Sequence, residues 1–190
     1  MQPSPQKVRK TAGGKVSLAA PKSSRKNRAV ELEAAAQSVR EELQKFAVEL
    51  SCKEVYLASP FARVEAVRNG LAAELFTKTV KEMHVDNETL YAMLHLSRAT
   101  ISRKLQTKGT LPSETSQRLL GLRKLIGQVE VMVEQSGVPK GFSAAKWVAG
   151  WLDEPSAALA GKKPGEFMDT AEGQELVSKL VARMQSGAYS

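Results

Sequence analysis

The residues with the clearest chemistry lie in a short segment between Ser97 and Gly109. It contains four basic side chains and no acidic one. Arginine and lysine bind phosphate oxygens, and arginine and glutamine also reach base edges in the major groove of DNA. We therefore interpret the segment as a DNA-binding face made of Ser97, Arg98, Ala99, Thr100, Arg103, Lys104, Gln106 and Lys108. From the residues alone, an ordinary helical hairpin with a solvated basic face is about equally well supported.

Two short helices are predicted to position this face. Asp86 can cap a helix through Leu90, Met93 and Leu94, and Ser97 can cap a second helix that ends near Gly109. At 100° per residue, Ile101 and Leu105 share one side of the second helix, and the other side carries Ala99, Thr100, Arg103 and Gln106. This pattern is typical of a helix-turn-helix unit, whose second helix enters the major groove.

Catalytic, metal and cofactor sites are not indicated. Cys52, His84 and His95 cannot make a four-ligand zinc site, and neither histidine pairs with the cysteine in a recognisable nucleophile pattern. His84 is interpreted as a polar residue at a helix end. Gly13-Gly14-Lys15 lies in a segment that is not expected to fold, so it is not interpreted as a phosphate-binding loop. We expect a protein that is not an enzyme and needs no cofactor.

Composition favours an all-α fold. In a chain of 190 residues, 42% hydrophobic residues can fill a core, whereas 5% aromatic residues disfavour a sheet-rich protein. No apolar run approaches the roughly 18 to 20 residues needed to cross a bilayer, and the start of the chain lacks the apolar core of a secretory signal. We therefore expect a cytoplasmic protein without a membrane partner.

The excess positive charge lies in an N-terminal arm. Residues 1–30 hold 8 of the 28 basic residues and no acid, so the remaining charges cancel. With three prolines, two glycines and few large apolar groups, residues 1–28 are predicted to be a flexible basic arm, which either contacts DNA or is a solvated tail. Residues 29–58 are predicted to form an N-terminal helix of unknown role, whose apolar stripe packs on the rest of the chain or on a second copy: Leu32, Ala36, Val39, Leu43, Phe46 and Leu50.

Further helices are predicted on both sides of a boundary at Gly137 to Gly141. Residues 60–136 contain helices over Phe61–Asn69 and Leu71–Met83, the helix-turn-helix unit, and a long helix that Ser113 caps. Its stripe of Leu119, Leu122, Ile126, Val129 and Val133 indicates core packing between two lobes.

Residues 142–190 are predicted to form the second lobe. Ser143 and Thr170 are predicted to cap its helices, while Trp151, Leu159, Phe167 and Leu180 are expected to be core. The last helix is predicted to end at Gly187, before a tail with Tyr189 and Ser190.

The C-terminal region resembles the toxin-binding domain of the Xre/MbcA/ParS antitoxin family. The resemblance rests on the order Trp151-Leu152, Pro155, Leu159, Gly161, Pro164, Phe167, Thr170, Gly173, Val177, Leu180, Arg183, Gly187 and Tyr189. The stretch from Leu96 to Leu120 resembles the Xre-like helix-turn-helix region that precedes this domain in the family. Ala160-Gly161 and Pro164-Gly165 depart from the usual loop pattern.

The resemblance implies a bacterial type II antitoxin. Its partners would be a RES-domain toxin that consumes or transfers ADP-ribose from NAD, and operator DNA bound for autoregulation. A homodimer or a larger toxin–antitoxin complex is expected. Exposed groups are expected to contact the toxin, and the ring and carboxylate of the tail could occupy a nucleotide pocket: Lys162, Lys163, Arg183, Tyr189 and Ser190.

Two other readings stay open. The chain could be a stand-alone helix-turn-helix transcriptional regulator without a toxin partner. It could also be an interaction protein whose helix-turn-helix no longer binds DNA. The specificity of the C-terminal motif favours the antitoxin.

Overall fold

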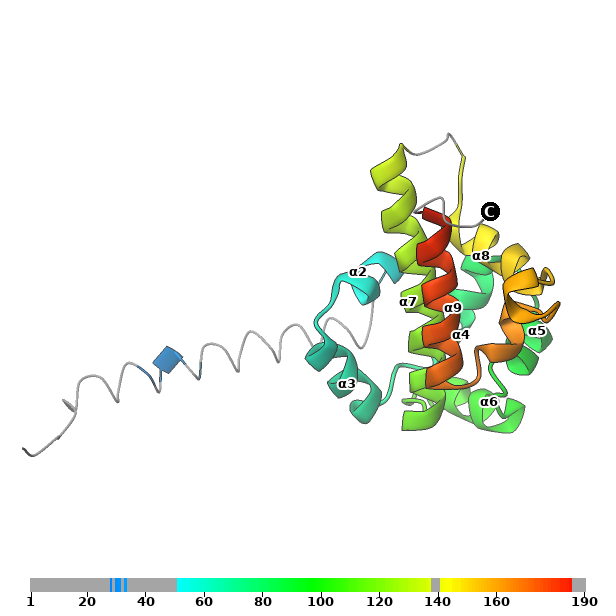
Figure 1. Ribbon diagram of the computed structural model, residues 1–190. Helices are drawn as coiled ribbons and strands as arrows, with labels where there is room; N and C mark the ends of the chain where they lie inside the picture. Colours follow the sequence, from blue (N-terminus) through cyan, green and yellow to red (C-terminus); the bar gives the residue numbers. More distant parts are fainter. Residues whose placement is uncertain (1–27, 29, 32, 34–50, 138–140, 186–190) are drawn as a thin grey trace, which may run out of the picture. The chain divides into compact units, whose positions relative to one another are not determined.

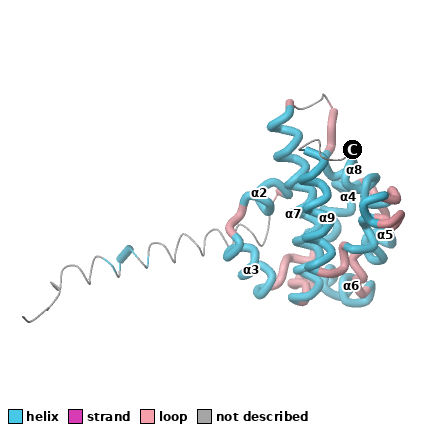
Figure 2. The backbone as a smooth tube through the Cα atoms, in the orientation of Figure 1, coloured by secondary structure: helices cyan, strands magenta, loops and turns pink. Residues whose placement is uncertain are grey.

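The computed structural model describes residues 28, 30, 31, 33, 51–137 and 141–185. The predicted arm of residues 1–28 and the stripe of residues 29–50 therefore lie almost wholly outside the described residues. Helices α2 to α9 all belong to the second of two compact units, residues 38–190 (Figure 1). Every element of three or more residues that is described is helical, which confirms the all-α prediction (Figure 2).

Two short helices precede the helix-turn-helix unit. Ser51 and Glu54 form a reciprocal capping box at the start of α2 (Cys52–Leu57), a signal that sequence reasoning missed. Ser59 caps α3 (Pro60–Asn69), and Gly70 ends it with φ 81°, as predicted. Arg63 closes the C-terminal end of α2 by donating to the carbonyl oxygens of Val55, Tyr56 and Ala58.

The next helix starts later than the sequence suggested. The predicted helix over Leu71–Met83 is α4 (Glu74–Met83), because Leu71 and Ala72 are used in an extended pairing. The Leu71 carbonyl accepts from the backbone N–H of Leu111 at 2.8 Å, and Ala72 forms a bridge with Thr110. This pairing joins the start of α4 to the segment that follows α6 (Arg98–Gln106), and so places α5 (Asn87–Met93) and α6 between two fixed ends.

The long helix α7 (Ser113–Ser136) is the centre of the fold. Its predicted cap was wrong: Ser113 is the first helical residue, Pro112 holds the N-cap position, and no side chain caps this end. Ser116 contributes in a different way, because its buried hydroxyl accepts from the Leu71 N–H and donates to the Leu111 carbonyl. The helix packs against α2, α3, α8 and α9 (Figure 1), as expected for core packing.

The C-terminal residues complete the same core. Ser143 caps α8 (Ala144–Asp153), and the Thr170 hydroxyl accepts from the Gly173 N–H at the start of α9 (Ala171–Gln185), as predicted. Two 3-10 turns, η1 (Ala157–Leu159) and η2 (Pro164–Phe167), connect these helices.

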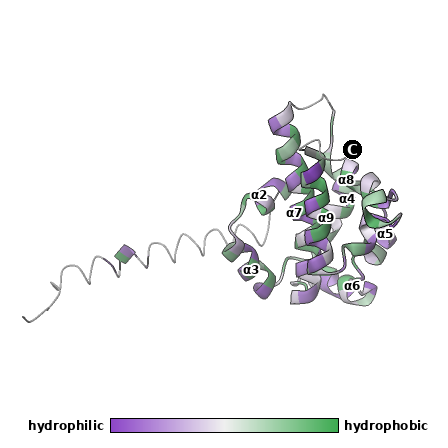
Figure 3. Ribbon diagram, viewed as in Figure 1, coloured by the Kyte–Doolittle hydropathy of each residue, from purple (hydrophilic) through white to green (hydrophobic). Residues whose placement is uncertain are grey.

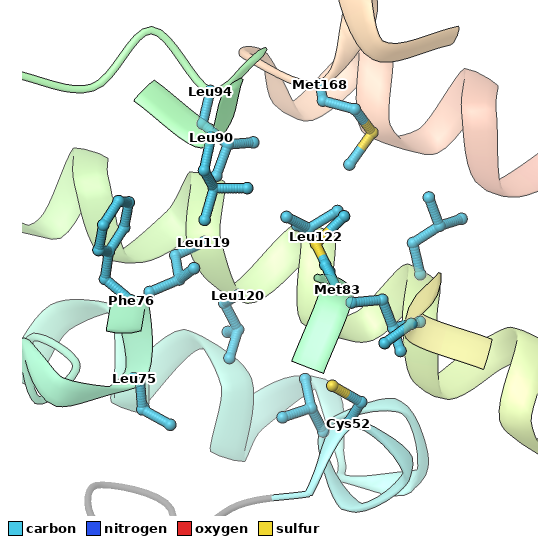
Figure 4. Packing of buried hydrophobic residues seen from close by; sticks show 14 of the residues in the cluster. Cys52, Leu75, Phe76, Met83, Leu90, Leu94, Leu119, Leu120, Leu122 and Met168 are labelled. Carbon is cyan, nitrogen blue, oxygen red and sulfur yellow. The ribbon is translucent and has the colours of Figure 1, made fainter. Parts of the chain in front are cut away.

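Buried side chains from both sides of the Gly137 to Gly141 segment pack together. Met168 lies with side chains of α4, α5 and α7 in one cluster (Figure 4). Both polar and apolar residues recur along α7 (Figure 3). Leu159 and Leu180 are core, as expected, whereas Trp151 and Phe167 are only partly buried at its edge. The division into residues 60–136 and 142–190 stays a prediction.

Candidate functional site

The eight predicted DNA-binding residues come together on α6 and the turn that follows it. The Ser97 hydroxyl accepts from the Thr100 N–H, and the fully buried Ile101 anchors the helix to the core. Thr100 and Lys104 are partly exposed, and the others are exposed to solvent: Ser97, Arg98, Ala99, Arg103, Gln106 and Lys108. The helix ends at Gln106 rather than near Gly109, because Lys108 adopts a left-handed conformation with φ 46°. The geometry is compatible with a basic recognition helix.

One acidic side chain enters this face, and sequence reasoning did not anticipate it. Glu88, in the first turn of α5, forms an ion pair with Arg98, in the first turn of α6. Both side chains are more than half exposed, so the pair contributes little stability and can open at low cost. Arg98 therefore has to exchange a carboxylate for phosphate or base atoms if it binds DNA.

The turn between α5 and α6 is held from outside the helix-turn-helix unit. Arg118 of α7 donates to the carbonyl of His95 at 2.8 Å and to that of Leu94 at 3.3 Å. The side chain of Gln174, on α9, donates in turn to the carbonyls of Arg118 at 3.0 Å and Met168 at 2.8 Å. These bonds connect the predicted DNA-binding turn to the last helix. The bonds to Leu94, His95 and Arg118 join residues that lie 23 to 56 positions apart in the chain, so no local pattern could reveal them.

A side-chain contact makes the same connection. His95 has φ 45°, and its Nδ1 lies 3.3 Å from Oδ2 of Asp169, just before α9. The two halves of the predicted domain organisation are thus joined by polar contacts as well as by a shared core.

The predicted toxin-contacting residues fall on two elements. Lys162 and Lys163 are exposed in the loop between η1 and η2, and Arg183 is exposed near the end of α9. The ammonium of Lys163 lies 2.8 Å from Asp153, whose hydrogen bond and charge raise the pKa of Lys163 above its usual value. The ammonium of Lys162 lies 6.0 Å from the ring centroid of Phe167. Tyr189 and Ser190 lie outside the described residues.

Two aromatic rings of α8 add an apolar feature to the C-terminal region. Trp147 and Trp151 stack on α8 with centroids 5.8 Å apart, and Trp147 remains partly exposed. Sequence reasoning placed Trp151 in the core and did not predict this partial exposure, since spacing along a helix does not show which neighbours cover a side chain.

Among the described residues, no group of three or more His, Cys, Asp or Glu side chains could hold a metal ion. Cys52 is buried, and its burial raises the pKa of its thiol to about 12, so the thiol is not a nucleophile at neutral pH. His84 ends α4 in a left-handed conformation, which confirms its predicted role. No helix in the described ranges is long and apolar enough to cross a membrane.

Comparisons with known proteins identify both regions. Residues 62–124 match the family model of the antitoxin Xre-like helix-turn-helix domain, and residues 142–187 match that of the antitoxin Xre/MbcA/ParS C-terminal toxin-binding domain. The chain is 41% identical over 138 residues to a curated protein of Sphingobium sp. (strain YBL2) named Prs ADP-ribosylating antitoxin, a match that covers 73% of this chain and 87% of that protein. The resemblance found in the sequence is confirmed, and the chain belongs to the Xre/MbcA/ParS family of antitoxins.

Proposed function

We propose that this antitoxin neutralises a RES-domain toxin by covering its NAD-binding active site, and that it binds its own operator DNA to autoregulate transcription. The observation that carries the proposal is the toxin-binding domain, matched over residues 142–187 and built on the same core as the helix-turn-helix unit. The name of the Sphingobium relative supports an ADP-ribosylation system. We assign that activity to the toxin, since NAD is the donor of ADP-ribose.

DNA binding is supported by the composition and exposure of α6. Its first turn is capped by Ser97 and carries Arg98 and Ala99 at the surface, where small and basic side chains let a helix approach a groove closely. Arg103 is exposed as well, one turn after Ala99. We assign Arg98 and Arg103 to bases or adjacent phosphates, and Lys104 and Lys108 to the DNA backbone.

Operator binding can be tested with matched arginine variants. In a gel-shift titration with the promoter of the antitoxin gene, Arg98→Ala and Arg103→Ala should each cost about 1 to 3 kcal/mol. Arg68→Ala is the control, because Arg68 is also 71% exposed and also pairs with a glutamate, but lies on α3. Unchanged operator affinity in the Arg98→Ala, Arg103→Ala double variant would refute the assignment of α6.

The N-terminal arm is proposed to add affinity without sequence specificity. Eight basic residues and no acid in residues 1–28 can release counterions from DNA, but they do not by themselves define a geometry for reading bases. Deleting residues 1–28 should weaken binding to operator and random DNA by similar factors, most clearly at low salt. A loss confined to the operator would contradict this role, and no loss on either DNA would identify a solvated tail.

Toxin contact is proposed for Lys162, Lys163, Arg183, Tyr189 and Ser190. The first three are exposed cations on the loop and last helix of the toxin-binding domain. The ring of Tyr189 has the size and aromatic character of a base, so it could occupy part of a pocket that is shaped for a nucleotide.

Co-expression tests this assignment. Growth of cells that express the toxin encoded next to the antitoxin should be rescued by the intact chain, and NAD consumption by the purified toxin should stop when the antitoxin is added. Truncation after Gly187 removes no described helix, so it should preserve the circular dichroism spectrum while rescue falls. Lys146→Ala, at an exposed site on α8 outside the proposed contact set, is the control. Full rescue by the truncated chain would show that the tail is not required.

A further inference from the structure

The turn before α6 is held by one arginine of α7. The guanidinium of Arg118 donates through Nη1 to the carbonyl oxygens of Leu94, at 3.3 Å, and His95, at 2.8 Å. Its Nη2 atom pairs with the carboxylate of Glu114, one helical turn earlier in α7. Both N–H groups of Nη1 and one of Nη2 are thus used within the chain, and the side chain is only 20% exposed. Arg118 is therefore committed to the turn and not available for a phosphate.

The position of this turn decides where the first residues of α6 lie. His95 precedes the N-cap residue Ser97 by two positions and Arg98, the first residue of α6, by three. Of the nine residues of α6, all of which are described, Ile101 alone is fully buried. The apolar core by itself therefore fixes the tilt of this short helix only weakly. A hydrogen-bonded turn next to its first residue removes that freedom, so Arg118 fixes the end of α6 that carries Arg98.

A residue of the C-terminal region meets the same turn. His95 has φ 45°, a left-handed conformation that glycine adopts more readily than any other residue. A glycine would relieve this strain but would have no side chain to reach the C-terminal region. The Nδ1 atom of His95 lies 3.3 Å from Oδ2 of Asp169. The turn is thus held at the His95 carbonyl by Arg118 and at the His95 ring by Asp169.

Gln174 of α9 connects these two contacts. Its side-chain amide donates to the backbone carbonyl of Arg118 at 3.0 Å and to that of Met168, the residue before Asp169, at 2.8 Å. Gly121 leaves room for this amide, because a Cβ at position 121 would lie 1.8 Å from Oε1 of Gln174. One side chain of α9 therefore fixes both the part of α7 that carries Arg118 and the segment that carries Asp169.

We infer that Arg118 and Gln174 are positioning residues for operator binding, which set the tilt of α6 against the DNA groove without touching DNA themselves. This role rests on the operator binding proposed above for α6. Gln174 belongs to residues 142–187, the region that matches the toxin-binding domain, so that region takes part in operator binding. Residues 62–124, which match the helix-turn-helix domain, are then not sufficient for full operator affinity.

A conservative replacement of Arg118 tests this role in the full chain. Arg118→Lys keeps the positive charge, but an ammonium group does not reproduce the planar fork that meets two carbonyls. In fluorescence-anisotropy titrations, Arg118→Lys should lower operator affinity by about tenfold, because the turn loses charge-assisted hydrogen bonds. Affinity for random DNA and the salt dependence of binding should stay unchanged, because no phosphate contact is removed. Arg68→Lys, the same exchange at an exposed site of α3, should change neither affinity.

A pair of glutamine variants tests the contribution of α9. Gln174→Ala removes both of its hydrogen bonds and should lower operator affinity by about fivefold. Gln128→Ala is the matched control, because Gln128 also joins α7 to α9 by donating to the Ser178 carbonyl at 3.0 Å, but lies ten residues beyond Arg118 along α7. Gln128 is the more deeply buried of the two, so general destabilisation would affect the control more. Gly121→Ala displaces the Gln174 amide and should match Gln174→Ala, and combining the two should cause no further loss.

Two results would overturn the positioning role. One is operator affinity in Arg118→Lys equal to that of the parent protein. The other is a parallel loss on operator and random DNA in a variant that keeps the parent's circular dichroism spectrum, which would make Arg118 a phosphate contact. If Arg118→Lys does not keep that spectrum, Gln174→Ala decides in its place. Failure of the parent protein to bind the operator, or unchanged binding by the Arg98→Ala, Arg103→Ala double variant, would instead refute the proposed function of α6 and this role with it.

Discussion

Replacing Gly127 by alanine tests the closest helix contact in the core. A Cβ at this position would lie 1.9 Å from the Cys52 carbonyl oxygen and 2.4 Å from its carbonyl carbon, both in the backbone of α2. Since ordinary contacts of this kind exceed 3 Å, α2 would have to move away from α7 by more than 1 Å. The gain in helix propensity from glycine to alanine is about 1 kcal/mol. Overpacking costs about 1 to 3 kcal/mol, and exposing the buried side chain of Val55 on α2 costs about 2 kcal/mol more.

The same substitution at Gly150 should have the opposite sign. Gly150 is exposed within α8, and a Cβ there would meet nothing within 4 Å. Gly150→Ala should therefore stabilise the protein by about 0.5 to 1 kcal/mol, through helix propensity alone. With the cost of overpacking, the release of Val55 and the gain in helix propensity combined, we expect Gly127→Ala to lower the free energy of unfolding by about 2 to 4 kcal/mol, so that the two variants lie on opposite sides of the parent protein.

Urea unfolding followed by far-ultraviolet circular dichroism measures both variants. The dependence of the unfolding free energy on urea concentration shows whether Gly127→Ala acts on the whole fold or detaches α2 first. Separate detachment of α2 broadens the unfolding transition and so lowers this apparent dependence. A Gly127→Ala variant as stable as the parent would refute the close approach of α2 to α7. A destabilised Gly150→Ala variant would refute the argument from helix propensity.

Three further predictions concern charged groups. Arg123 is fully buried and donates to Glu82 at 2.9 Å. Arg123→Ala should therefore lower the free energy of unfolding by about 3 kcal/mol, because it leaves Glu82 without this partner. In the same urea experiment, the double variant Arg123→Met, Glu82→Leu should recover most of that loss. Glu88→Gln should strengthen operator binding severalfold in a gel shift, because it releases Arg98 and removes a negative charge that faces phosphate; weaker binding would contradict this role. Burial raises the pKa of Glu130 above its ordinary value of 4.5, so the folded state binds more protons than the unfolded state and loses stability as pH rises through the window above 4.5. Glu130→Gln should reduce that loss of stability in thermal unfolding scans. An unchanged dependence of stability on pH would contradict this prediction.

Some features of the candidate site are specified by residues close together in the sequence, and others by contacts between residues far apart in the sequence. The caps by Asp86, Ser97 and Ser143, and the end of α3 at Gly70, follow from side chains within a few residues of each helix end. The sequence indicated them because capping is a local interaction. The eight residues are close together because they fall within twelve consecutive positions, from the N-cap Ser97 to Lys108 just after α6.

Local reasoning failed where a long-range contact competed with it. Ser113 has the right residue type for a cap, but the backbone at Pro112 begins α7, and Ser116 holds Leu71 instead. Leu71 fits a helical pattern, yet its carbonyl is bound by Leu111, forty residues later. Each of these outcomes depends on a partner that sequence spacing does not specify.

By itself, the sequence determined the all-helical fold, the helix-turn-helix unit and the antitoxin family, because periodicity, caps and a spaced motif are all written along the chain. Only the tertiary structure decided that Arg118 and Gln174 hold the turn before α6, that Glu88 pairs with Arg98, and that Gly127 admits α2 against α7. The physical reason is that hydrogen bonds, ion pairs and close packing depend on distances between side chains, and these distances exist only after helices far apart in the chain have packed on one core.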